Sequence, residues 1–252
     1  MSDLHEGYPQ SDIRADAAAV DQGLRRYMLG IYNKVGLGLL LAAAVAYATA
    51  SVPWLRDLLF KTSAQGGAHR ISLTFLGSMV AFGPVFLLLG SSFALSKPKP
   101  LRTGALYWSV VSLVGASLGV LFLTFTGGSI AITLAGSAIG FGGLSLIGYT
   151  TTRDLTGLGS FLIMGLVGLV LTLAANLALG SSTIGYVTGL VGVGIFAGLI
   201  AYDTQRLKLN YQQFSDDEDS MAVASDLGAL SLFINFVNLF QFLLVAFSGQ
   251  RR

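Results

Sequence analysis

The chain contains no cysteine, only two histidines and few charged residues, since Asp, Glu, Lys and Arg make up 11% of its 252 residues. Soluble domains carry roughly 25%. Without cysteine the chain can form neither a disulfide nor a thiolate metal site, and His5 and His69 lack the spacing of paired metal ligands. The net charge is only +2, and its basic residues are scattered. A nucleic-acid partner is therefore excluded, and no cofactor is predicted.

Two long stretches of the chain contain no charge at all. Residues 103–152 and 155–202 form uncharged runs of 50 and 48 residues, separated only by Arg153 and Asp154. A membrane-spanning helix needs about 20 apolar residues to cross about 30 Å of hydrocarbon. Each run is therefore long enough for two helices and a turn. The sequence predicts a polytopic membrane protein surrounded by the lipid bilayer.

The predicted fold class is all-α, and no strand pattern is evident. Residues 1–20 are polar and are expected to form a disordered tail, while residues 21–34 are amphipathic and predict an interfacial lead-in helix. Residues 35–250 are expected to form a transmembrane domain of seven helices. The charge-free segments behind this prediction are residues 35–52, 73–95, 104–125, 129–149, 156–179, 184–202 and 227–247.

The distribution of Lys and Arg over alternate loops predicts the orientation. With the N-terminus in the cytoplasm, that side holds 10 basic residues and the opposite side holds 3. The loops at about residues 54–72, 126–128 and 180–183 are then external. Arg251 and Arg252 would also be external if the last segment crosses fully. The charge bias would be better satisfied if that segment entered the membrane and returned.

Glycine pairs spaced four residues apart recur within the apolar segments. Gly115-Ala-Ser-Leu-Gly119 matches the G-x-S-x-G nucleophile pattern, but no His or Lys lies within a predicted span to accept the proton of the serine. An enzyme is therefore not predicted. We interpret Gly115 and Gly119 as a small-residue face for close helix packing. The same spacing is found in three further pairs: Gly136 with Gly140, Gly185 with Gly189, and Gly194 with Gly198.

Asp203 lies at the end of the sixth apolar segment, about one helical turn before the basic residues that mark the membrane surface. An ionised carboxylate at that depth is costly, and such residues usually face the bundle interior or an aqueous cavity. The alternative is a solvated aspartate at a helix end, paired with Arg206 three residues later. The spacing alone favours neither interpretation.

The last apolar segment carries polar residues on one helical face. Ser231, Asn235, Asn238 and Gln241 follow one another at steps of four, three and three residues. Polar side chains in hydrocarbon need partners. The stripe could serve only interhelical hydrogen bonding, or it could line an aqueous pathway together with Asp203.

Three stretches of the chain resemble the Bax inhibitor-1 family of membrane proteins, in particular its bacterial members. They are Leu24 to Leu39, Ala201-Tyr-Asp-Thr-Gln-Arg-Leu-Lys208, and Gly228-Ala-Leu-Ser-Leu-Phe-Ile-Asn-Phe-Val-Asn-Leu-Phe240. The resemblance implies six transmembrane helices around a shorter, central seventh helix, in the cytoplasmic (inner) membrane. It also implies a pH-sensitive calcium leak, gated by two aspartates that share a proton. Asp203 matches the first aspartate, but the second position is Asn235, so the carboxylate pair is absent.

Two functional hypotheses follow. The first is a passive cation leak with calcium ions and protons as ligands, gated by Asp203, Asn235 and Arg206. Ser231, Asn238 and Gln241 would line its path, and whether any residue binds a metal is left open. The second is a non-conducting membrane regulator that binds another membrane protein, such as a membrane protease or a stress-response protein. The missing carboxylate and the acidic run at residues 216–219 motivate the second hypothesis.

Overall fold

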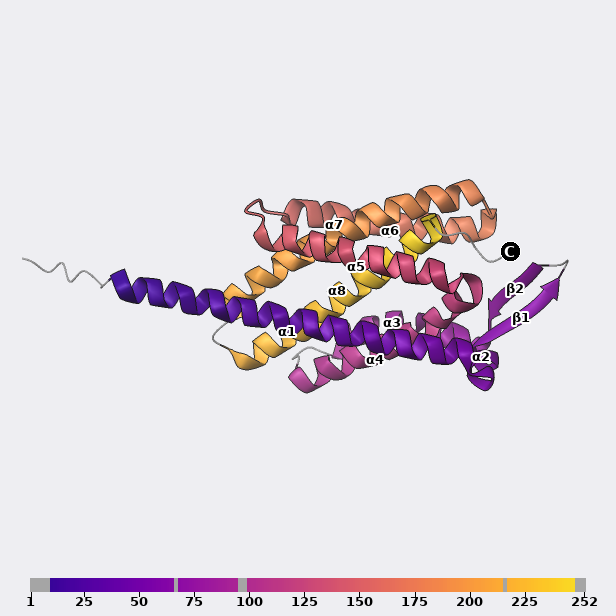
Figure 1. Cartoon of the computed structure of the whole chain (residues 1–252), viewed down its shortest axis with the longest axis horizontal. Coiled ribbons are helices and arrows are strands. Elements are labelled where there is room, and N and C mark those ends of the chain that lie inside the picture. Colours follow the sequence, from indigo (N-terminus) through magenta and orange to yellow (C-terminus); the bar gives the residue numbers. More distant parts are fainter. Residues whose placement is uncertain (1–9, 66–67, 95–98, 215–216, 248–252) are drawn as a thin grey trace, which may run out of the picture.

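The computed structural model describes residues 10–65, 68–94, 99–214 and 217–247. Within these residues the chain forms eight helices and one hairpin of two strands (Figure 1). The elements in chain order are α1 (Gln10–Ser51), α2 (Pro53–Leu59), β1 (Phe60–Gln65), β2 (Ala68–Leu73), α3 (Phe75–Ala94), α4 (Pro100–Thr124), α5 (Gly127–Thr150), α6 (Thr156–Leu179), α7 (Ser182–Phe214) and α8 (Glu218–Phe247).

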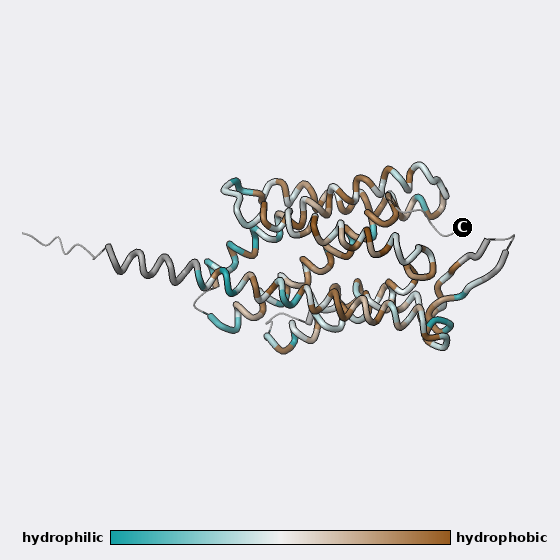
Figure 2. Tube along the Cα trace, in the orientation of Figure 1, coloured by the Kyte–Doolittle hydropathy of each residue, from teal (hydrophilic) through white to brown (hydrophobic). Residues whose placement is uncertain are grey.

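Six of the helices are long and apolar enough to cross a membrane, namely α1, α4, α5, α6, α7 and α8. In the parts of these helices that Figure 2 colours, apolar residues predominate, and hydrophilic residues gather mainly near helix ends. Many large apolar side chains face outward, such as Leu177 on α6 and Ile139 on α5. This outer surface suits lipid and not water. The prediction of an all-α, polytopic membrane protein is confirmed.

Helix α1 is continuous over 42 residues and includes three parts that the sequence analysis had separated. It takes in residues 10–20, the predicted lead-in at residues 21–34 and the first apolar segment. In Figure 1 its first turns extend beyond the other helices. The disordered tail was predicted for residues 1–20. Residues 1–9 lie outside the described residues, and residues 10–20 belong to α1.

The hairpin was not predicted, because residues 54–72 were expected to form a loop. β1 and β2 pair in antiparallel register, with Phe60 opposite Leu73. Phe60 is buried, and the hydroxyl of Thr74 accepts a hydrogen bond from the backbone N–H of Gly77 at the start of α3. The strands are short and largely polar, so they show little alternation of apolar and polar residues. The Gly66-Gly67 dipeptide between them was the available hairpin signal.

Helix α8 packs against α7, α4, α1 and α5, and a larger share of it is buried than of any other candidate span. The expected shorter, central seventh helix is not confirmed, because α8 has 30 residues. It runs from the end at which α7 finishes to the end that carries the hairpin (Figure 1). The shorter apolar helix is α3, whose apolar stretch covers residues 75–91.

Glycine supports close packing of α4 on α1, as predicted. A Cβ atom added at Gly115 would lie 2.8 Å from the Cα atom of Ala42, and one at Gly119 would contact the side chain of Thr49. The same prediction is wrong for Gly136 and Gly140 on α5, where an added Cβ would meet nothing within 4 Å. Glycine pairs spaced four residues apart therefore do not by themselves show that another helix packs against them.

Candidate functional site

Asp203 lies in the second half of α7, where that helix is held firmly against its neighbours. The side chain of Gln205 joins α7 to the loop between α5 and α6. Its Oε1 accepts from the backbone N–H of Leu155 at 2.8 Å, and its Nε2 donates to the carbonyl of Arg153 at 2.7 Å. Gly148 of α5 packs on the backbone of Ala201, where an added Cβ would lie 2.9 Å from the carbonyl carbon. These contacts fix the position of the Asp203 backbone.

The carboxylate of Asp203 is buried and surrounded by three partners, and its side chain is 6% exposed. Its Oδ2 accepts hydrogen bonds from the hydroxyl of Ser231 and from Nδ2 of Asn235, the latter at 2.7 Å. Its Oδ1 lies 3.3 Å from Nη2 of Arg206. We call these four residues the Asp203 network. The expected contact between Asp203 and Asn235 is present.

Arg206 forms the exposed side of this network. It lies one turn after Asp203 on α7, its side chain is 45% exposed, and its guanidinium lies 5.8 Å from the centroid of the Tyr202 ring. The ion pair predicted from the i, i+3 spacing therefore exists. The interpretation of Asp203 as a solvated residue is nevertheless wrong, because only the arginine reaches solvent.

The polar stripe on α8 does not act as one unit. Ser231 and Asn235 reach Asp203, whereas Nδ2 of Asn238 donates to the backbone carbonyl of Ile234 on its own helix, at 2.9 Å. Gln241 lies almost two turns beyond Asn235 and is half-buried. The structure thus brings together four of the six predicted site residues and leaves Asn238 and Gln241 outside the network.

The profile of the family described as "Inhibitor of apoptosis-promoting Bax1" matches residues 24–252. The chain belongs to the Bax inhibitor-1 family. It is 54% identical to a Caulobacter vibrioides protein over the full length of both chains. It is also 36% identical to the inner membrane protein YbhL of Escherichia coli K12, over 97% of this chain and 99% of that one. A Rickettsia prowazekii protein is 39% identical over 92% of each chain.

This Bax inhibitor-1 family protein has a second buried carboxylate, which the sequence analysis missed. The side chain of Asp226 on α8 is 8% exposed, and its Oδ1 lies 2.5 Å from Nζ of Lys34 on α1. Its Oδ2 accepts from the hydroxyl of Thr103 on α4 at 2.7 Å. We call these three residues the Asp226 network. Lys34 and Asp226 each border an apolar segment and lie 192 residues apart, so nothing in the sequence indicated that they pair.

The described residues include no group of three or more His, Asp or Glu side chains that could hold a metal ion. Among the described loop residues, Asp154 and Asp217 are exposed carboxylates. Hydrogen bonds from Thr156 lower the pKa of Asp154, and hydrogen bonds from Ser220 lower the pKa of Asp217. Both loop carboxylates are therefore ionised at neutral pH. The chemistry that the Asp203 network itself can perform is to accept or release a proton and to make or break a contact between α7 and α8.

Proposed function

We propose that this protein is a passive, cation-permeable leak of the inner membrane, with calcium as the expected ion, and that the Asp203 network closes it. The observation that carries the proposal is the carboxylate of Asp203, which is buried at the α7–α8 interface while its counter-ion Arg206 is half-exposed. Carboxylates within a membrane bundle are costly, and each is a candidate for an ion or proton pathway.

The hydrogen bonding at Asp203 explains how a proton could open such a path. Two donors, Ser231 and Asn235, converge on the single oxygen Oδ2. A proton added to Oδ2 makes it a donor, and the amide Nδ2 of Asn235 cannot accept. A proton added to Oδ1 instead removes the negative charge that holds Arg206. Either event weakens the contacts that close the path, so we expect the flux to rise as the pH falls.

Flux from purified protein tests this proposal directly. Liposomes that contain a calcium indicator are prepared with the native protein, with Asp203→Ala, and with Asp219→Ala as a control for an exposed acidic residue on α8. We expect calcium entry above that of empty liposomes for the native protein. Asp203→Ala should increase it severalfold because the closing contact is lost, and Asp219→Ala should match the native protein. If all three behave like empty liposomes while folded, the leak is refuted.

One observation favours the alternative function, a non-conducting regulator that binds another membrane protein. Asn235 stands where the family resemblance implies a carboxylate, while Glu218 and Asp219 present exposed negative charge at the first turn of α8. Such a surface could bind a basic segment of a membrane protease or a stress-response protein. This function is favoured if no variant shows flux and if Asp219→Ala no longer binds a protein partner that the native protein binds.

We also propose that the N-terminus of the chain lies in the cytoplasm. It rests on the 10-to-3 distribution of basic residues. Because the native chain has no cysteine, single cysteines can report topology. Ser63→Cys in the hairpin should react with a membrane-impermeant reagent from outside, whereas Gln213→Cys near the end of α7 should react only from the cytoplasmic side. Exchanged reactivity of the two positions would reverse the orientation.

A further inference from the structure

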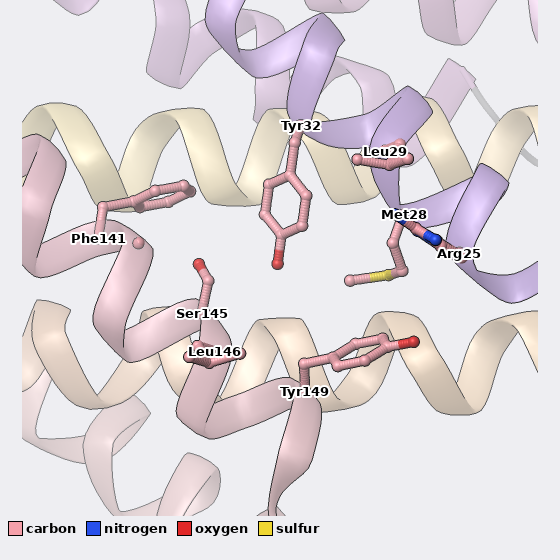
Figure 3. A pocket seen from close by; sticks show the side chains of 9 residues that line it. Arg25, Met28, Leu29, Tyr32, Phe141, Ser145, Leu146 and Tyr149 are labelled. Carbon is pink, nitrogen blue, oxygen red and sulfur yellow. The ribbon is translucent and has the colours of Figure 1, made fainter.

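A crevice opens between α1 and α5, at the side of the bundle. Helix α1 packs mainly on α4 and α8, and α5 packs mainly on α7 and α8, so α8 lies beneath the gap between them. Two cavities of about 390 and 430 Å³ occupy this crevice. We call the one nearer the N-terminal part of α1 the upper cavity (Figure 3) and the other the lower cavity.

The two cavities meet at one aromatic pair. Tyr32 of α1 and Phe141 of α5 line both cavities, and their rings lie edge to face with centroids 6.2 Å apart. This pair separates an upper part with polar groups from a lower part that is apolar. The crevice is therefore a single elongated site with two chemically different ends.

The lower cavity suits a hydrocarbon chain. Phe236 and Phe240 of α8 lie buried against it, and the side chains of Leu40 and Leu134 at its edges are exposed, so it opens toward the bilayer. Along α1 its lining extends from Tyr32 to Ala46, which corresponds to about 21 Å of helix. One leaflet of the hydrocarbon core is about 15 Å thick. An acyl chain can therefore lie in the cavity along most of its length.

The upper cavity contains a polar group that lacks a partner. Ser145 of α5 is 5% exposed, and its Oγ makes no hydrogen bond to any described residue. A buried hydroxyl without a partner costs free energy. In Figure 3 the hydroxyls of Ser145 and Tyr32 point into the same space, and Arg25 lies at its edge. Arg25 is exposed and cationic.

We propose that this crevice binds one anionic glycerophospholipid from the surrounding bilayer. Its phosphate accepts hydrogen bonds from the hydroxyls of Ser145 and Tyr32 and pairs with Arg25. One of its acyl chains passes the Tyr32–Phe141 pair and fills the lower cavity. A phosphate provides both the acceptor that the Ser145 hydroxyl lacks and the charge that complements a guanidinium. Water could supply the acceptor but not the occupant of the apolar part. The proposal does not depend on whether the protein conducts ions.

Native mass spectrometry tests the proposal. Protein is released from nanodiscs that contain equal amounts of phosphatidylglycerol and phosphatidylcholine, and the retained lipid is counted. We expect one phosphatidylglycerol per chain. Arg25→Gln and Ser145→Ala should each lower its retention about tenfold, as expected for one hydrogen bond to a charged group. Arg26→Gln is the matched control, because Arg26 is also exposed but does not line the cavity, and it should retain the lipid fully.

A second pair of variants tests the acyl-chain end. Ala138→Trp fills the lower cavity and should prevent retention, whereas Ala135→Trp places the same side chain elsewhere on the exposed face of α5 and should not. Ser145→Ala should also stabilise the delipidated protein, because it removes the unpartnered hydroxyl. Equal retention of both lipids, or retention that is the same in Arg25→Gln, Arg26→Gln and the native protein, would overturn the proposal.

Discussion

Two carboxylates are buried in the described part of the chain, and they lie in contrasting surroundings. Asp203 receives its hydrogen bonds from the adjacent helix α8 and pairs with Arg206, three residues away on its own helix. Asp226 pairs with Lys34, which is 192 residues away in sequence, and accepts from Thr103, which is 123 residues away. The Asp226 network therefore joins α1, α4 and α8, whereas the Asp203 network joins only α7 and α8.

This difference indicates which network can change state. Separation of Asp203 from Ser231 and Asn235 requires only a shift between two neighbouring helices, and the half-exposed Arg206 can remain in solvent. Separation of Asp226 from Lys34 and Thr103 would leave a charge buried among three helices, which is strongly unfavourable. The Asp203 network is suited to open and close, and the Asp226 network is suited to hold the bundle together.

The largest expected effect is the loss of the Lys34 charge. Lys34→Gln leaves Asp226 buried without its counter-ion, so the free energy of unfolding should fall by about 3 kcal/mol, at the low end for buried pairs because Lys34 is 30% exposed. Denaturant titration in detergent micelles, followed by circular dichroism, measures this change. The double variant Lys34→Gln with Asp226→Asn should recover much of the loss. The single variant Asp226→Asn is measured as well. If the double variant loses as much free energy of unfolding as the two single variants lose in sum, the pair does not stabilise the bundle.

A smaller effect is expected from the matched change in the other network. Arg206→Gln removes a cation that is 45% exposed, and Ser231 and Asn235 still donate to Asp203. The free energy of unfolding should fall by about 1 kcal/mol, because the lost cation is partly screened by its exposure and the buried carboxylate keeps two hydrogen bonds. The same titration applies. A loss equal to that of Lys34→Gln would show that the two networks do not differ in the way proposed.

The positions of the spans followed from the sequence because long uncharged runs have few alternative structures. The residues alone indicated only that Asp203 and the polar stripe each need partners in hydrocarbon. The contact of Asp203 with Asn235 was expected from the family resemblance. Hydropathy does not record pairing between distant helices. It therefore could not reveal the Asp226 network, whose members each border an apolar segment.

Two other features depended on tertiary structure. The hairpin β1–β2 has little alternation of polar and apolar residues, so only the Gly66-Gly67 dipeptide could have indicated it. The split of the α8 stripe also depends on packing, because one helical face meets different neighbours along its length. Ser231 and Asn235 face Asp203 on α7, whereas Asn238 bonds to its own backbone.

The pH profile of calcium flux for the native protein, Asn235→Asp and Asp203→Asn tests the central claim most directly. Nδ2 of Asn235 lies 2.7 Å from Oδ2 of Asp203. In Asn235→Asp two carboxylates would be that close and could not both ionise readily, so they should share a proton that keeps the path closed. Its flux should rise as that proton is lost with increasing pH, within about pH 5 to 8. The native flux should instead rise only toward the acid end, and Asp203→Asn should flatten the response in both backgrounds. Identical profiles for all of these proteins would contradict the assignment of the gate to Asp203.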